Sequence, residues 1–418
     1  MISRSILLRR ASTLSLRMKS TNVKKEENTF EKELKAKIEL HGPMNLSQFM
    51  LEVLSNPNKG YYTSKENVLG ASGDFITAPE ISQMFGECIA IWIIHEWRKM
   101  GSVKPLNIIE FGPGQGTLMQ DILRTFQKLI PTELKDISIH LVETSPILTK
   151  IQEARLCGYF HNNTERIDEN IVHRAISKQG LTVNWYTRVS DVPKGFSFFV
   201  ANEFFDALPI HQFVKNPNTK IWEEVLVDIK ENNLVFVKSR GRTLANQYIQ
   251  NDPLFETLEV AEISPKSGVI METLSERIVE FGGSALIIDY GYSKVDKNIN
   301  RDTFRAFKNH KVHNPLQDIG QADLTADVNF DYLKQKTGLH TTTYGPVSQR
   351  QFLKQLGIEV RCNLLKESNP KIANDLSKSL ELLIGPDQMG ERFKFFCLFP
   401  KTMEPIHSEY PPAGFHEN

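Results

Sequence analysis

One short segment constrains the fold of this chain more than any other. Residues 108–117 read IIEFGPGQGT, so an apolar run ends in a turn that carries Gly112, Gly114 and Gly116. A second apolar run ends 27 residues after Gly116 in Glu143, within HLVETSP. A doubly wound α/β sheet places a glycine turn after one strand and, at the end of the next, a carboxylate that binds ribose hydroxyls. The pairing predicts such a sheet, with a nucleoside-containing cofactor at its strand ends.

The spacing inside the turn distinguishes between classes of cofactor. The third glycine of a dinucleotide fingerprint would fall at Thr117, and the segment lacks the lysine of a Walker A loop. What remains is an acid, Glu110, two residues before the first glycine. A carboxylate there suits a cofactor with an ammonium group and no pyrophosphate. We therefore predict S-adenosyl-L-methionine, bound by Glu110, the three glycines and Glu143. The alternative is an ordinary tight loop.

Charge, hydropathy and cysteine content limit the partners that we expect. The formal net charge of the 418-residue chain is +0, which gives no support to nucleic acid as the main partner. No apolar run approaches the ~20 residues of a transmembrane helix, so we expect no membrane insertion. The four cysteines have neither metal-binding nor redox spacing, and we expect free, buried thiols.

The first 25 residues differ in composition from the rest of the chain. They hold seven basic residues and five serines, and no acid occurs before Glu26. Several leucines between positions 7 and 16 could line one face of a helix. A basic, serine-rich, acid-free amphipathic start is typical of a mitochondrial transit peptide. We predict such a peptide at residues 1–25, with a disordered basic tail as the alternative.

Hydrophobic periodicity divides the remaining chain into segments. Mostly continuous apolar runs, which suit a parallel sheet covered on both faces, predict strands at 106–111, 138–143, 182–186, 196–201 and 284–290, and a last strand at 393–399. Helical spacing or composition predicts helices at 28–40, 46–54, 80–100, 116–129, 146–156, 329–337, 348–356 and 371–384. Alternating runs joined by polar turns predict an antiparallel ribbon within 210–270.

These segments predict four parts. The transit peptide is followed by a helical N-terminal region at 26–105 that covers the cofactor site. The α/β domain spans 106–400 and is interrupted by the β-rich insertion at 210–270. A C-terminal tail occupies 401–418.

The fourth strand ends in a second group of polar residues, within FVANEFFDALPIHQF. Because ligands of doubly wound sheets lie outside the carboxyl ends of the strands, Asn202, Glu203 and Asp206 should emerge beside the cofactor. Paired carboxylates match the planar fork of a guanidinium group and would orient its attacking nitrogen. We predict Glu203 first and Asp206 second as catalytic acids for methyl transfer, with Asn202 at the cofactor. Asp206 has an equal alternative as the cap of a following helix.

Two further segments are candidates for contact with the cofactor. Gly73, Asp74 and Phe75 form a polar–aromatic turn before the helix that starts at 80, although a capped helix start explains the same pattern. Trp185 and Asp191 lie at and after the end of the third strand and could contact adenine. Their alternative is a core tryptophan followed by a loop acid.

Two later segments are candidates for contact with the substrate. Asp289, Tyr290 and Gly291 end the fifth strand and would face the same crevice, unless they only form a turn. The polar stretch 301–327 could cover the substrate as a long loop. A metal site there is disfavoured, because its residues lack the spacing of a helix pair with a third ligand; the residues are His310, His313, Asp318 and Asp323.

In combination and order, these segments resemble the MidA-like family. The resemblance covers about residues 28–400 and rests on the runs GASGDFITAPEISQMFGE, EFGPGQGTLMQDILR, VETSPIL, NEFFDALPIHQF, LIIDYG, QADLTADVNF, GPVSQRQFL and LLIGPDQMGERFK. It implies a class I, Rossmann-like methyltransferase sheet. The family's cofactor residues map onto the glycine turn, onto Glu143 and onto the Gly73–Phe75 turn, and its crevice acids map onto Glu203 and Asp206.

The resemblance also implies a function. In animals and other eukaryotes the family is the mitochondrial arginine methyltransferase that assists assembly of respiratory complex I. By that resemblance, the chain is a mitochondrial matrix enzyme that transfers methyl groups from S-adenosyl-L-methionine to a protein arginine. The product would be symmetric dimethylarginine, formed by a type II enzyme on a complex I subunit of the peripheral arm.

Two alternatives from other classes remain. One is an assembly chaperone that keeps the methyltransferase fold with little turnover, and the other is a methyltransferase of small molecules. The intact Glu110, glycine turn, Glu143 and Glu203 argue against the chaperone, which needs none of them. The large insertion and the N-terminal region argue mildly against a small-molecule substrate. The sequence leaves the oligomeric state open, a homodimer included.

Overall fold

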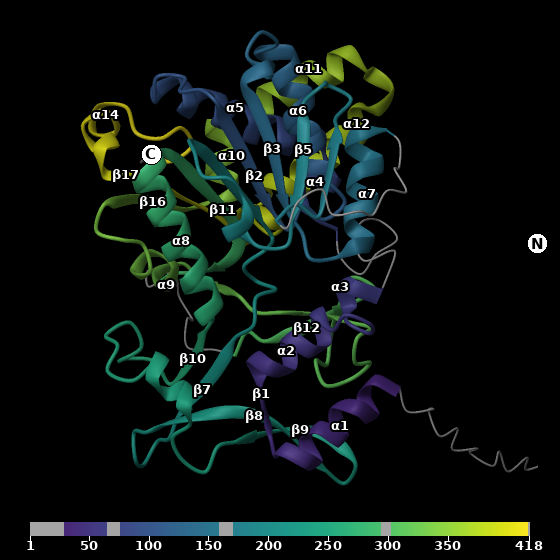
Figure 1. Ribbon diagram of the computed structural model, residues 1–418, viewed down its shortest axis with the longest axis vertical. Coiled ribbons are helices and arrows are strands. Elements are labelled where there is room, and N and C mark those ends of the chain that lie inside the picture. The colour runs from purple at the N-terminus through teal and green to yellow at the C-terminus, as the bar shows by residue number, and fades with distance from the viewer. Residues whose placement is uncertain (1–28, 65–75, 159–169, 294–301, 417–418) are drawn as a thin grey trace, which may run out of the picture.

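The computed structural model describes residues 29–64, 76–158, 170–293 and 302–416. The predicted transit peptide and the predicted turn at Gly73, Asp74 and Phe75 lie outside the described residues. The described chain forms a large lobe on a nine-stranded sheet and a smaller lobe on a five-stranded antiparallel sheet (Figure 1). Among these residues, no helix combines the length and apolarity needed to cross a bilayer. All four cysteines are buried and free, as predicted.

The five predicted central strands form the parallel centre of the large sheet, in the order β11-β6-β2-β3-β5. Every residue of β2 and β6 is buried, which agrees with their apolar runs. The last strand, β17 (Phe393–Pro400), lies between β11 and β16 (Thr341–Ser348) and runs antiparallel to both. The central strands are β2 (Leu106–Phe111), β3 (Ile137–Val142), β5 (Thr182–Tyr186), β6 (Ser197–Asn202) and β11 (Gly283–Tyr292). The small strands β4 (His173–Ile176) and β15 (Val328–Asn329) pair with β5 and β11.

Helices cover the large sheet with two separate apolar cores. One core contains α5 (Gln83–Lys99), α6 (Thr117–Leu129) and α7 (Pro146–Cys157), and the other contains α8 (Pro265–Phe281) and α9 (Phe330–Gln335). The first core also takes in α10 (Gln349–Gln355), α11 (Ile358–Ser368), α12 (Ala373–Ile384) and α13 (Met389–Arg392). The C-terminal tail, with α14 (Glu404–Glu409), folds back onto this core, where the Ala413 N–H donates to Glu96 at 2.9 Å.

The single helix predicted at 80–100 is wrong. A short helix, α4 (Ala78–Ile81), is separated from α5 by Ser82, whose backbone is extended with φ −162° and ψ 139°. The Ser82 hydroxyl accepts from the Met84 N–H and so caps α5. Apolar periodicity did not reveal this break, because the residues at helical spacing, Phe85, Ile89, Trp92 and Ile93, all lie within α5.

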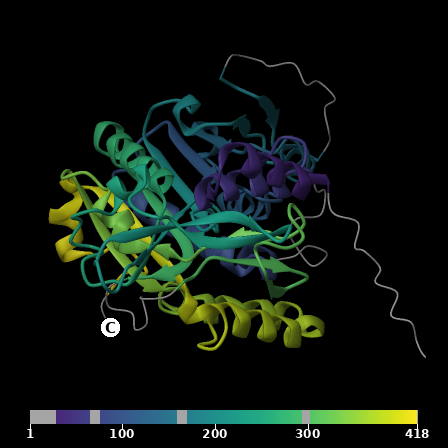
Figure 2. The same ribbon diagram turned by 90° about the horizontal axis from the view of Figure 1, so that it is seen from below.

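The small lobe joins three distant parts of the chain. Its sheet contains β1 (Met44–Asn45), β7 (His211–Lys215), β8 (Trp222–Lys230), β9 (Asn233–Lys238) and β10 (Val260–Ile263). The predicted antiparallel ribbon is thus confirmed, but it ends before 270 because α8 begins at Pro265. On this sheet lie α1 (Thr29–His41) and α2 (Leu46–Ser55), followed by α3 (Tyr61–Ser64) (Figures 1 and 2). Their core includes residues of β12 (Arg305–Lys308) and β14 (Asp323–Thr325), which form a three-stranded sheet with the more exposed β13 (Lys311–His313).

Candidate active site

A cavity of about 370 Å³ lies where the carboxyl ends of β2, β3 and β6 meet α2, α3 and α4. The strand order reverses at this point, since β3 and β6 flank β2 on opposite sides. Doubly wound sheets bind their ligands at such a switch point. Leu51, Leu54 and Tyr62 contribute the wall from the small lobe, so N-terminal helices cover the strand ends.

The glycine turn lines the cavity with backbone. Gly112 and Gly114 both have φ 55°, a left-handed conformation that glycine adopts without steric cost. A Cβ on Gly112 would approach Phe204 Cδ2 to 3.0 Å. Gly116 has φ 80° and is the N-cap of α6, whose first residues also line the cavity. The turn therefore needs glycine for its backbone conformation, and it brings the free N–H groups of a helix start to the cavity.

Two buried acids from neighbouring strand ends line the same cavity. Glu110 Oε2 has no hydrogen-bond partner among the described residues. Glu143 accepts from the Ser145 N–H at 2.7 Å and from Gln152 Nε2 at 3.0 Å. Burial raises the pKa of Glu110 to about 8, with a further rise from the Glu143 carboxylate. Burial also raises the pKa of Glu143 to about 7, against the lowering effect of its hydrogen bonds. A ligand that brings a cationic group would favour the ionised acids.

Glu203 enters the cavity from the end of β6. Its φ of 50° is uncommon for a residue with a side chain. Its Oε1 accepts from the Ala78 N–H at 3.0 Å and from Asn202 Nδ2 at 3.4 Å. Glu203 Oε2 and Asn202 Oδ1 are buried without a hydrogen-bond partner in the described chain. Burial raises the pKa of Glu203 to about 8. The structure thus brings Asn202 and Glu203 together with Glu110 and Glu143 around one cavity.

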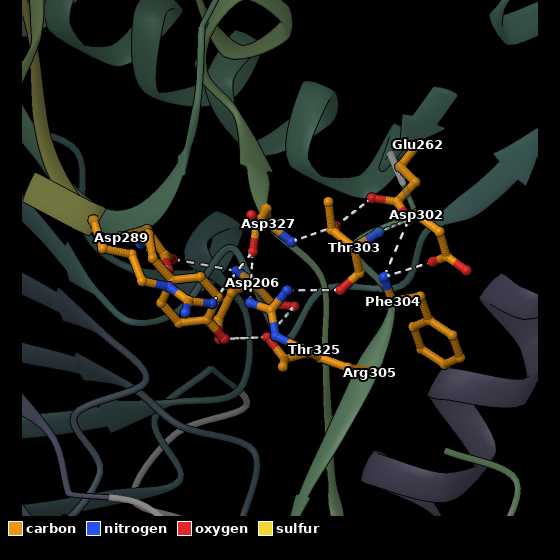
Figure 3. Close-up of polar contacts among 11 residues, drawn as sticks. Asp206, Glu262, Asp289, Asp302, Thr303, Phe304, Arg305, Thr325 and Asp327 are labelled. Atoms are coloured by element: carbon orange, nitrogen blue, oxygen red, sulfur yellow. Dashed lines mark hydrogen bonds and ion pairs between the residues drawn. The ribbon is translucent and has the colours of Figure 1, made fainter. Parts of the chain in front are cut away.

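Asp206 does not line the cavity. Its carboxylate accepts from the hydroxyls of Tyr290 and Thr325 instead (Figure 3). No helix follows Asp206, so the alternative of a helix cap is also wrong. Its backbone carbonyl accepts from the Ala326 N–H at 3.1 Å, which ties the turn after β6 to the segment after β14.

Asp289 shapes the turn that follows Glu203. This fully buried carboxylate accepts three backbone N–H groups through Oδ2, from Phe204 at 3.2 Å, Phe205 at 3.0 Å and Asp206 at 3.2 Å. Neither Asp289 nor Tyr290 or Gly291 is part of the cavity lining. The end of β11 therefore supports the site instead of facing the ligand, and Asp289 is a positioning residue.

Trp185 and Asp191 were predicted to contact adenine, but neither residue lines the cavity. Trp185 is fully buried and donates from Nε1 to Gln152 Oε1 at 2.8 Å, which places it behind Glu143. Asp191 Oδ2 lies 3.1 Å from Arg188 Nε. Arg188 itself lines the cavity, so Asp191 can influence a ligand there through its contact with Arg188.

The segment predicted to cover the substrate instead supports the small lobe. Its described residues form β12–β14, and none of them lines the cavity. Asp318 accepts from Lys308 Nζ at 2.7 Å, and Asp323 accepts from the Tyr62 hydroxyl at 2.8 Å. His313 Nε2 lies 3.3 Å from Asp318 Oδ2. Within the described ranges, no three metal-ligating side chains come together.

One acid of the cavity was missed by the sequence analysis. Glu80 on α4 lines the cavity, and its Oε2 is buried without a hydrogen-bond partner in the described chain. Its segment was interpreted only as the start of a long helix. The residues TAPE shortly before Ser82 were the available signal, since a proline at a helix start and a serine cap three residues later allow a separate turn of helix.

The fold and the site together define a class I methyltransferase that depends on S-adenosyl-L-methionine. The sheet is doubly wound with an antiparallel last strand, and its switch point carries the glycine turn and two strand-end acids. The residues fit the cofactor, because Glu110 has a buried carboxylate oxygen free for an ammonium group. Gly112 and Gly114 line the cavity with left-handed backbone that carries no side chain, which leaves space for a ligand beside Glu110.

Comparisons with known proteins identify the family. Residues 88–347 match the family described as "Putative S-adenosyl-L-methionine-dependent methyltransferase", and the chain belongs to this MidA-like family. It is 46% identical over 400 residues to "Protein arginine methyltransferase NDUFAF7, mitochondrial" of Danio rerio, covering 92% of each chain. The Homo sapiens protein of that name is 44% identical over 87% of this chain and 82% of its own.

A solved structure supports the fold. A Burkholderia thailandensis protein described as a "likely methyl transferase", bound to S-adenosyl-homocysteine, superposes with a TM-score of 0.73 at 23% identity. The match covers 90% of this chain and 94% of that one. S-adenosyl-L-methionine is therefore the cofactor of this chain, by family and by the residues at its strand ends.

Proposed function

We propose that this protein methylates arginine side chains of a protein substrate in the mitochondrial matrix, as a step in the assembly of respiratory complex I. The observation that carries the proposal is Glu203, a partly buried acid in the cavity that also contains the cofactor residues, whose Oε2 is buried without a hydrogen-bond partner among the described residues. A carboxylate there suits the cationic fork of a guanidinium group. The names of relatives that are 40–46% identical over most of the chain support arginine as the acceptor.

The chemistry asks little of the protein beyond alignment and proton control. The cofactor supplies an electrophilic methyl group, and its transfer forms a C–N bond, breaks the C–S bond with the electron pair left on sulfur, and releases one proton from nitrogen. Glu203 binds the guanidinium and orients the attacking nitrogen. Burial raises the pKa of Glu203 to about 8, and binding of the cationic guanidinium favours its ionised form, which can then accept that proton. Asp289 keeps Glu203 in place through the three N–H groups that follow it.

The finer part of the proposal is symmetric dimethylation by a type II enzyme on a complex I subunit of the peripheral arm. The resemblance of the whole chain to the MidA-like family supports it.

Labelling tests both levels of the proposal. The mature chain is incubated with labelled S-adenosyl-L-methionine and a mitochondrial matrix extract depleted of its own enzyme, and the labelled residue is mapped by mass spectrometry. We expect label on arginine of one complex I subunit, with fragmentation typical of the symmetric product. Label on lysine or on a small molecule would overturn the arginine assignment, and label on arginine of unrelated proteins would overturn the complex I assignment.

A further inference from the structure

Two acids that line the cavity are not among the residues assigned to the cofactor, and each has one buried carboxylate oxygen without a hydrogen-bond partner among the described residues. These are Glu80 on α4 and Glu203 at the end of β6. We propose that Glu80 is a specificity-determining residue that holds the substrate guanidinium jointly with Glu203. The proposal rests on the proposed arginine methylation and identifies the second carboxylate of that site.

The break between α4 and α5 brings the two acids together. Because Ser82 is extended, α4 is a separate turn of helix that does not follow the axis of α5. The N–H of Ala78, at the start of α4, donates to Glu203 Oε1 at 3.0 Å. Glu80 lies two residues further along the same turn, and its charge contributes to the raised pKa of Glu203. The two carboxylates are thus held by one short helix that is anchored to the end of β6.

The unpartnered atoms at this end of the cavity are all acceptors. Glu80 Oε2, Asn202 Oδ1 and Glu203 Oε2 are buried and have no hydrogen-bond partner in the described chain, and Asn202 as a residue is only 9% exposed. Buried acceptors without donors are costly, so this group favours a ligand that brings several donors. A guanidinium brings five N–H donors in a plane and no acceptor, whereas an ammonium brings three donors at one point.

The charges around Glu80 also favour binding of a cation. Arg155 lowers the pKa of Glu80, while burial raises it by more. The guanidinium of Arg155 nevertheless donates to Thr117 Oγ1 at 2.7 Å and to Gln115 Oε1 at 2.8 Å. Glu80 forms no ion pair with any residue of the described ranges. When both are ionised, two neighbouring carboxylates that form no ion pair repel each other, and a bound guanidinium would relieve that repulsion.

Glu80 suits this role better than Asp206, the second acid predicted from the sequence. Asp206 Oδ1 also lacks a partner, but its other oxygen is held by Tyr290 and Thr325, and the residue does not line the cavity. With Glu80 and Glu203 on the guanidinium, two nitrogens are bound and the third remains free to attack. Transfer then forms the C–N bond at that nitrogen while sulfur keeps the C–S electron pair, and Glu203 takes the proton.

The test measures recognition of the guanidinium apart from turnover. The full chain, saturated with S-adenosyl-homocysteine, is titrated with N-acetyl-arginine methylamide and with the citrulline compound, which has nearly the same shape without the charge. We expect the parent to prefer arginine at least about tenfold, since a buried charge pair is worth that much or more. Glu80→Gln should reduce the preference to about threefold or less. Glu39→Gln, which removes one exposed acid of α1, should leave it unchanged.

Each outcome decides the proposal. Glu80→Gln should keep the parent affinity for S-adenosyl-homocysteine, because Glu80 is not among the residues assigned to the cofactor. An unchanged preference for arginine in Glu80→Gln, or a loss of S-adenosyl-homocysteine binding, overturns the role of Glu80. Glu80→Ala gives a second measurement if the amide disturbs folding. The labelling assay and the titration fail independently. If methyl label maps to arginine but Glu80→Gln prefers arginine over citrulline as strongly as the parent does, only the role of Glu80 is refuted. If label maps to another residue type while Glu80→Gln loses the parent's preference for arginine, only the proposed function is refuted.

Discussion

The buried acid before the glycine turn allows a quantitative prediction. Glu110 has an unpartnered oxygen and a pKa raised to about 8 by burial, with a smaller contribution from Glu143. If the ammonium group of the cofactor binds the ionised carboxylate, Glu110 must lose its proton on binding. Lowering the pH from about 8 to about 6 should then weaken binding about 50-fold through Glu110. Glu143, with a pKa of about 7, should add about tenfold over the same range.

The substitution Glu110→Gln separates these contributions. The amide keeps the shape but cannot ionise, so the variant should bind more weakly at pH 8 and should retain only the shallow, about tenfold dependence from Glu143. Titration calorimetry with S-adenosyl-homocysteine, in two buffers of different ionisation enthalpy, counts the protons released. At pH 7 we expect about 1.4 protons for the parent and about 0.5 for the variant. A variant that keeps the parent's steep pH dependence would refute the pairing of Glu110 with the ammonium group.

Three further predictions concern the turn, the catalytic acid and pH. Gly114→Val should abolish binding of S-adenosyl-homocysteine, because valine is strained at φ 55° and would enter the cavity. Gly180→Val is the control: at φ 83° with open space around it, this variant should lose stability but keep binding. Equal calorimetric binding by both variants would contradict the site. Glu203→Gln should lower kcat for methyl transfer by about 100-fold or more with near-normal cofactor binding, and transfer at the parent rate would remove its role. Burial raises the pKa values of four glutamates, Glu110, Glu143, Glu203 and Glu262, from 4.5 to about 7 or 8, so the folded state keeps their protons up to a higher pH than the unfolded state. Their contribution to stability is present below about pH 4.5 and is lost as the pH rises through about 7–8. The Tm of the cofactor-free protein should therefore fall between about pH 5 and 8, and a rising Tm over that range would show that these acids are ionised in the folded protein.

The parallel sheet was predictable because its signals are local. Each central strand is a short apolar run, and a strand buried on both faces needs no more than that. The turn at Gly112–Gly116 was equally clear, since its left-handed conformation excludes side chains. Glu143 and Glu203 followed from the rule that strand ends of a doubly wound sheet share one edge.

The remaining parts of the site depend on contacts between distant residues. The N-terminal helices share a core with β8, β9 and β14, and no periodicity within α1 or α2 indicates that partner. Asp289 was ambiguous in the sequence, because its three N–H donors lie 83 to 85 positions earlier in the chain. Asp206 and Glu203 are three residues apart, and only the turn held by Asp289 sends one side chain to the cavity and the other to Tyr290.

The sequence by itself determined the sheet, the glycine turn and the strand-end acids, and with them the cofactor. These features follow from steric and hydrophobic preferences that act over a few neighbouring residues. Only the tertiary structure decided which acids line the cavity together, because the hydrogen bond from the Ala78 N–H to Glu203 spans 125 positions of the chain. That contact exists only after the helix breaks at Ser82 and α4 packs against the end of β6, and it places Glu80 where a second carboxylate can act.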